Sequence, residues 1–204
     1  GDALPRVQEA LAAAEPSGGT PTAAALTRAL RYFTTGAGAQ LPGARYVLLA
    51  TDGGPNCNEA NSCEESACTV NLDAQCPMGV ANCCDESLAG PGAQLGCLDD
   101  VATRDAVRAL AMADIPTFVV GIPGTENYAS LLDGLALAGG RPSTSGAERY
   151  YAVSAAGSDS GGLTSVLRTI TSSLIMTCRL QLGSVPPDLK KLNVRVDGKL
   201  VPKD

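Results

Sequence analysis

Two oxygen-bearing residues are the candidates for binding chemistry in this chain. Thr20 stands in the stretch Ser17-Gly18-Gly19-Thr20-Pro21-Thr22, and Asp52 follows a short apolar run and precedes two glycines. A hydroxyl and a carboxylate are hard oxygen ligands that suit Mg²⁺, Mn²⁺ or Ca²⁺. Each residue also has a reading that needs no metal, because Thr20 could cap a helix and Asp52 could shape a turn.

The cysteines form the most distinctive pattern. Seven of the eight fall in one stretch: Cys57, Cys63, Cys68, Cys76, Cys83, Cys84 and Cys97. No pair has the C-x-x-C spacing that zinc sites usually show, and the chain contains no histidine. The spacing therefore favours disulfides over zinc. Disulfides in turn favour an extracytoplasmic location: the periplasm, the cell surface or the medium.

Composition argues against an enzyme and against nucleic-acid binding. The 204 residues carry a net charge of −6, with acidic and basic residues interspersed and no basic block. The lack of histidine removes the commonest general base, and no nucleophile motif is present. No apolar run approaches the ~20 residues of a spanning helix. We predict that the chain is not an enzyme, does not bind nucleic acid and has no transmembrane segment.

Apolar periodicity predicts alternating helices and strands. Helical stripes cover residues 2–15, the stretch after Thr20 to near Gly36-Ala37-Gly38, a stretch from Asp99 or Asp100 to about Ala113, residues 128–138 and residues 162–176. Continuous apolar runs predict buried strands at 45–51, 116–122 and 149–153. We expect an α/β fold, three-layered, doubly wound and Rossmann-like, with a mainly parallel sheet and helices on both faces.

The predicted sheet places the two candidate residues at one edge. Ligands of open parallel sheets bind beyond the carboxyl ends of the strands. The Thr20 loop opens a helix, and Asp52 ends the strand that follows this helix. Both residues are therefore expected at the ligand-binding edge.

Residues 53–99 break the alternation. They are polar, rich in Cys, Asn and Gly, and have no period, and the stretch is too long for an ordinary connection. We predict an insertion held together by its own disulfides.

The end of the chain also changes character. Residues 179–182 and 192–196 alternate with period two, and Asp197-Gly198 is a hairpin signal. The predicted organisation is a domain at residues 1–177 followed by the start of a small β appendage at 178–204.

Three motifs, in this order, resemble the von Willebrand factor A (vWA) domain family: Gly18-Gly19-Thr20-Pro21-Thr22, an apolar strand ending in Thr51-Asp52-Gly53, and a helix ending in Ala138-Gly139-Gly140. The stretch from Asp52 to Asn58 is similar to a bacterial, cysteine-rich subgroup of secreted or lipoprotein A domains. The resemblance covers roughly residues 1–176. It implies that Thr20 and Asp52 belong to a metal-ion-dependent adhesion site and bind the ion directly or through water.

One motif of that family has no counterpart here. The family's first loop, D-x-S-x-S after the first strand, is missing, and the nearest approach, Asp85-Glu86-Ser87-Leu88-Ala89, lacks the final serine. The resemblance implies that the chain begins about halfway through such a domain. Sites for these ions need about six oxygens, so we expect Mg²⁺, Mn²⁺ or Ca²⁺ to be absent or weakly held.

The position of the last cysteine limits the disulfide pairing. Cys178 follows the last predicted helix, whose length places it on the order of 20 Å from the opposite edge, where the insertion lies. A disulfide needs Cα atoms within ~7 Å. We predict three bridges inside the insertion, different partners for Cys83 and Cys84, and no partner within the chain for one insertion cysteine and for Cys178.

Three functions remain as hypotheses. The first is a binding or adhesion module that takes a protein partner at the edge beside Asp52. The second is a structural component of the cell envelope with a vestigial metal site. The third, a hydrolase that uses carboxylates at this edge, is the least favoured, because the chain has no histidine and no nucleophile motif.

Overall fold

A computed structural model describes residues 3–15, 18–154 and 162–175, together with residues 188, 193, 195–196 and 199–200. The chain divides into two compact units, Gly1–Arg168 and Thr169–Asp204, and each is described by itself. None of the helices in the described ranges is long and apolar enough to cross a membrane.

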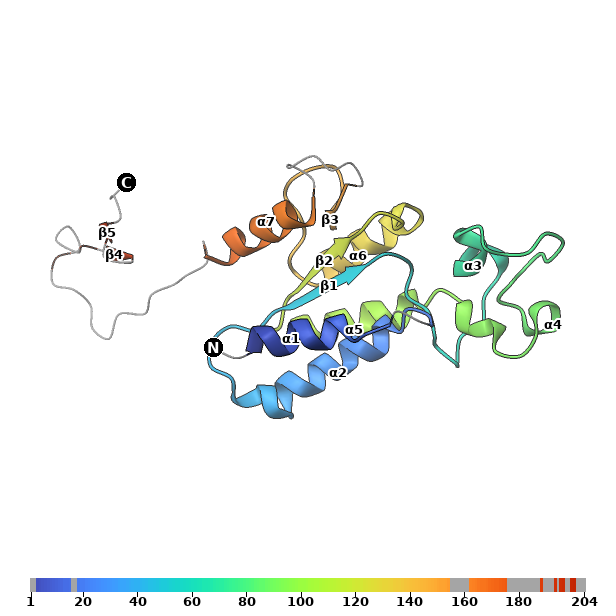
Figure 1. Ribbon diagram of the computed structural model, residues 1–204, viewed down its shortest axis with the longest axis horizontal. Coiled ribbons are helices and arrows are strands. Elements are labelled where there is room, and N and C mark those ends of the chain that lie inside the picture. The colour runs from blue at the N-terminus through green and yellow to red at the C-terminus, as the bar shows by residue number, and fades with distance from the viewer. Residues whose placement is uncertain are drawn as a thin grey trace. The chain divides into compact units, whose positions relative to one another are not determined.

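A three-stranded parallel sheet, in the order β1-β2-β3, lies in the first unit (Figure 1). Its strands are β1 (Val47–Thr51), β2 (Thr117–Gly121) and β3 (Tyr151–Ala152). β1 and β2 pair along their whole length, with Val47 opposite Thr117 and Thr51 opposite Gly121. The prediction of an α/β chain with a parallel sheet is confirmed.

The strand expected at 149–153 is shorter in the structure. The backbone amides of Arg149 and Tyr150 both donate to the carboxylate of Asp133, the second at 3.1 Å. These two amides are therefore bound to a helix side chain and not to a neighbouring strand. Tyr151 and Ala152 pair with β2, and the Val153 amide after them donates to the Gly121 carbonyl at 2.8 Å.

Helices fill the connections close to the predicted positions: α1 (Ala3–Ala12), α2 (Thr22–Thr34), α5 (Asp100–Met112), α6 (Ala129–Ala138) and α7 (Leu163–Ile175), with the 3₁₀ helices η1 (Ala37–Gln40) and η4 (Glu126–Tyr128). α2, α5 and α6 pack around Val119 of β2 in one core, whose fully buried members include Val107, Leu110 and Leu132. Burial of each such side chain stabilises the fold by about 1.5–3 kcal/mol. This core covers one face of the sheet.

The opposite face of the sheet is aromatic. Phe118 is buried between the rings of Tyr46 and Tyr151, with centroids 6.0 and 5.9 Å away. On the same face, Leu48 of the edge strand β1 is 46% exposed. The edge of the sheet at β1 is thus less covered than its centre.

The insertion contains four single turns of helix that the sequence pattern did not predict: η2 (Glu65–Ala67), α3 (Thr69–Leu72), α4 (Glu86–Ala89) and η3 (Ala93–Gly96). Helices this short are not stable alone in water and have no room for an apolar stripe. Other contacts must hold them in place.

In the second unit, β4 (Arg195–Val196) and β5 (Lys199–Leu200) pair antiparallel on either side of the predicted turn Asp197-Gly198. The predicted strand at 179–182 lies outside the described residues, as does Cys178.

Candidate functional site

The loop that carries Thr20 fits tightly against the start of the insertion. A Cβ atom on residue 19 would collide with the side chains of Asn56 and Cys57, so any residue other than glycine would have to displace them. Pro21 is the N-cap of α2, and no side chain caps the helix. Thr20 is therefore not the helix cap that its sequence position allowed. Within the described residues, its side-chain hydroxyl makes no hydrogen bond.

Asp52 follows β1 directly and is exposed. The turn after it is shaped by Thr51, whose hydroxyl donates to the carbonyl of Gly53 at 2.9 Å. The Asp52 carboxylate has no hydrogen bond or ion pair with any described residue. A role in shaping the turn is thus not what this side chain performs.

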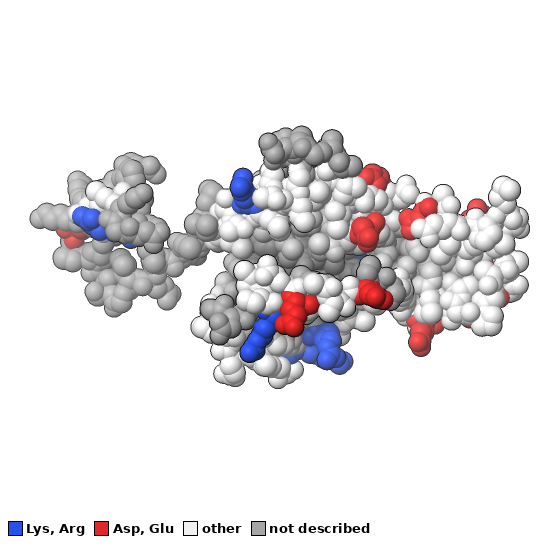
Figure 2. All heavy atoms as spheres, viewed as in Figure 1, with Lys and Arg blue, Asp and Glu red and all other residues white. Residues whose placement is uncertain are grey.

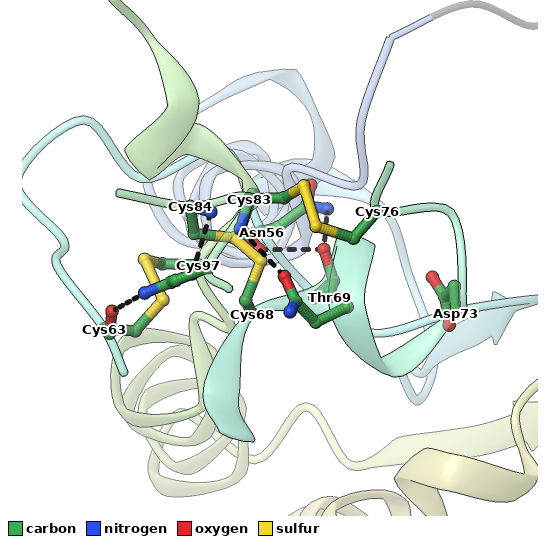
Figure 3. Close-up of a disulfide and its surroundings, with 12 residues drawn as sticks. Asn56, Cys63, Cys68, Thr69, Asp73, Cys76, Cys83, Cys84 and Cys97 are labelled. Atoms are coloured by element: carbon green, nitrogen blue, oxygen red, sulfur yellow. Dashed lines mark hydrogen bonds between the residues drawn. A yellow bond between two sulfur atoms is a disulfide. The ribbon is translucent and has the colours of Figure 1, made fainter. Parts of the chain in front are cut away.

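Asn56 joins the two loops, and the sequence analysis did not single it out. Its Oδ1 accepts from the backbone amide of Thr20 at 2.6 Å, and its own backbone amide donates to the Thr20 carbonyl at 2.9 Å. Its Nδ2 donates to the hydroxyl of Thr69 at 3.1 Å (Figure 3). The only signal in the sequence was an amide side chain just after Gly-Gly-Pro. We call residues 18–20, 52 and 56 the rim.

Three disulfides hold the insertion together (Figure 3). They are Cys63–Cys97, Cys68–Cys84 and Cys76–Cys83. Three bridges were expected inside this stretch, and Cys83 and Cys84 do bind different partners. Their sulfurs form a small core of their own with Val70 and Val80. Three disulfides fit an oxidising, extracytoplasmic environment.

Cys57 is the cysteine without a disulfide in the described part of the chain. It lies beside the rim, where its thiol contacts Oδ1 of Asn56 at 3.1 Å. The Sγ atoms of Cys63, Cys84 and Cys97 lie within 4.8 Å of one another. Reduced, these three could hold a metal ion, but as members of disulfides they have no thiolate to offer.

Side chains also fasten the insertion to the α/β frame, by which we mean the sheet with α2, α5 and α6. At its neck, Nδ2 of Asn58 donates at 2.9 Å to the buried carboxylate of Asp99, the last residue of the insertion and the N-cap of the frame helix α5. Farther along, the hydroxyl of buried Tyr128 donates to the Asp73 carboxylate at 2.8 Å. Burial and the neighbouring Asp73 raise the pKa of Tyr128 well above its usual value. The insertion is therefore held at two places, at its neck through Asp99 and near its middle through Asp73.

A cleft of about 420 Å³ opens where the Thr20 loop meets the insertion. Thr20, Asn56, Cys57, Asp73 and Gln75 contribute polar side chains to it. Asp52 does not line it. The sequence motifs pointed to Thr20 and Asp52 but not to Asp73, because nothing in their spacing shows that the insertion folds back toward Thr20. We call this the rim cleft.

The oxygens of this region match Mg²⁺, Mn²⁺ or Ca²⁺ in type but not in number. Thr20 and Asp52 offer two hard ligands. Among the described residues, Asp73 and Gln75 add one free oxygen each on the cleft side. Oδ1 of Asn56, in contrast, already accepts from the Thr20 amide and contacts the Cys57 thiol. About six oxygens are needed. The residues present therefore do not complete a site for such an ion.

Comparison with known proteins adds no relative. No family model, no curated protein and no solved structure matches this chain.

Proposed function

We propose that this chain is a vWA-like binding module that works outside the cytoplasm and takes a protein partner at the rim beside Asp52. The resemblance of its ordered motifs to the vWA family supports the proposal, and three disulfides agree with the location.

One observation carries the proposal: neither the Thr20 side chain nor the Asp52 side chain makes a hydrogen bond or ion pair with a described residue. The hydroxyl of Thr20 caps no helix, and the carboxylate of Asp52 shapes no turn. Yet the backbone beside each is held in place, because Asn56 bonds to the Thr20 loop, and Thr51, next to Asp52, pairs with Gly121 and donates to the Gly53 carbonyl. Polar side chains that are held in place but unpartnered are suited to meet a ligand. A partner carboxylate could add ligands to a weakly held Mg²⁺, Mn²⁺ or Ca²⁺.

A structural component of the cell envelope is the second candidate. The observation in its favour is the insertion itself, whose three disulfides would give a durable surface with or without a ligand. In that case the metal site is vestigial.

Site-specific photo-crosslinking separates the two. A crosslinking amino acid is placed at Gly53, where a side chain has open space and Asp52 next to it is kept, and, as a control, at Met112, which is 90% exposed at the C-terminal end of α5. In the cells that produce the protein, a binding module gives one discrete crosslinked partner from position 53 and none from 112. Equal or diffuse crosslinking from both positions would support the structural component. Repeating the experiment with a chelator shows whether the partner needs a divalent ion.

A further inference from the structure

Charge is distributed unevenly along this chain, contrary to the interspersed pattern expected from composition. Residues 53–99 contain seven acidic residues and no lysine or arginine, a formal charge of −7, whereas the whole chain carries −6. In Figure 2 the insertion shows acidic side chains and no basic ones. The remainder of the chain is therefore close to neutral, and the negative potential is concentrated on the insertion.

The rim cleft concentrates hydrogen-bond acceptors beside this surface. Asp73 binds Tyr128 through Oδ1, which leaves its second carboxylate oxygen without a partner among the described residues. In the described part of the chain, the hydroxyl of Thr20 and the side-chain amide of Gln75 are also unpartnered there. Among the described residues that line the cleft there is no lysine or arginine to neutralise Asp73.

The supply of ligands argues for a side chain and against a bare ion, and the cleft has room for a side chain. Its volume of about 420 Å³ is many times the ~30 Å³ that a water molecule occupies. Two of the nearby oxygens are also already used, since Oδ1 of Asn56 binds the Thr20 amide and the Thr69 hydroxyl donates to the Gly96 carbonyl. A long side chain with a cationic end fills the space and pairs with the carboxylate.

We propose that the rim cleft receives the lysine or arginine side chain of a protein partner, with Asp73 as its counter-charge and Thr20 and Gln75 as further acceptors. The stem of such a side chain packs on Val70 and Leu95, which also line the cleft. The negative surface of the insertion speeds the encounter with a cationic partner. This inference rests on the proposed function and names the chemistry of the partner.

Short peptides test it directly. The probes are acetyl-Gly-X-Gly-amide with X as Arg, Lys, Glu or Leu, titrated into the full, oxidised, isotope-labelled chain and followed by NMR. The Arg and Lys peptides are expected to shift the amides of residues 18–20, 56–57 and 73–75 and to slow alkylation at Cys57, as read by peptide mapping. The Glu and Leu peptides should do neither.

Asp73→Asn is the decisive variant. It should weaken the Arg peptide about tenfold, since a hydrogen bond to a charged group is lost. The fold should survive, because the side-chain amide oxygen introduced at position 73 can still accept from Tyr128. Glu64→Gln is the matched control: it removes the same charge from the insertion but lies outside the cleft, so binding should change less than about twofold in ~0.15 M salt.

Three results would overturn the inference. One is no response to the Arg and Lys peptides; another is equal weakening by both variants, which would mean a diffuse charge effect. The third is a response of the same amides to Mg²⁺ or Ca²⁺ alone, which would make the cleft an ion site. None of these bears on the proposed function, whose own test is the partner crosslinked from position 53.

Discussion

In the α/β frame the buried side chains are mainly leucine, valine and isoleucine, whereas in the insertion they are mainly cysteines. The frame buries Leu110, Ile115 and Leu132 between α2, α5, α6 and β2. The insertion buries Cys68, Cys83, Cys84 and Cys97, and its longer contacts come from asparagine side chains. The frame is therefore stabilised by apolar area removed from water, and the insertion by cross-links that restrict its unfolded state.

This difference bears on the rim, because each region supplies part of it. The frame side supplies Thr20 and Asp52, and the insertion supplies Asn56. The insertion also supplies Asp73, which lines the adjoining rim cleft. A change that loosens either region should alter the site, but through a different physical cause. The following variants separate these causes, in order of decreasing effect.

Leu132→Ala should destabilise the frame most. The side chain is 0% exposed, and its removal leaves a cavity, so the free energy of unfolding should fall by about 2–5 kcal/mol. Urea denaturation followed by circular dichroism measures it. Leu48→Ala is the control: because Leu48 is 46% exposed, a loss under about 1 kcal/mol is expected, and an equal loss would contradict the assigned core.

Loss of single disulfides should follow loop length. Cys63–Cys97 spans 34 positions and Cys76–Cys83 only 7. Replacing both cysteines of a bridge by serine should therefore destabilise the insertion by about 3–4 kcal/mol for the first pair and about 2–2.5 kcal/mol for the second. The rate of limited proteolysis between residues 59 and 97 measures this destabilisation. The opposite order would mean that strain or packing, and not chain entropy, dominates.

Asn56→Ala should uncouple the rim. It removes the acceptor for the Thr20 amide and the donor to Thr69, at a cost of about 1–3 kcal/mol. The Thr20 amide should also exchange with deuterium faster. Asn71→Ala is a comparison variant, because Asn71 bonds only within the insertion, to Ala81 and Cys83. If it also exposed the Thr20 amide, Asn56 would not be the specific link.

Tyr128→Phe should have the smallest effect, about 1 kcal/mol, because one hydrogen bond to Asp73 is lost while the ring stays buried. The substitution should also change how the free energy of unfolding depends on pH. The pKa of Tyr128 is raised by burial and Asp73, so its contribution is complete below the unfolded value of about 10 and is lost as pH rises above it.

Burial also raises the pKa values of Tyr150 and Tyr151. The Tyr128→Phe variant should therefore keep part of the alkaline decline in the free energy of unfolding, but with a shallower slope. Parallel wild-type and variant curves above pH ~10 would contradict a hydrogen-bonded, neutral Tyr128.

The frame was well predicted because its apolar residues follow regular local patterns. Leu26, Leu30 and Phe33 recur at helical spacing, and the runs at β1 and β2 are apolar throughout, so both signals are local. The late start of β3, at Tyr151 and not at residue 149, could not be predicted. Its cause is Asp133, sixteen positions earlier, whose carboxylate accepts from the Arg149 amide.

The site was only half predictable. Thr20 and Asp52 stand out by their place after turns and strands. Asn56 and Asp73, by contrast, are positioned by contacts with residues far away in sequence: Asn56 with Thr20, 36 positions away, and Asp73 with Tyr128, 55 positions away. The bonds that fold the insertion back are disulfides and asparagine side chains, and neither leaves a periodic pattern. The pairing of Thr20 with Asp73 in one cleft thus appears only in the structure.

The central claim, that frame and insertion are separately stabilised regions meeting at the rim, is tested most directly by hydrogen–deuterium exchange before and after reduction. Reduction should release the amides of residues 59–97 and those of Thr20 and Asn56, while the β2 amides at 117–121 stay protected. Simultaneous loss of protection in β2 would show one cooperative unit and contradict the account.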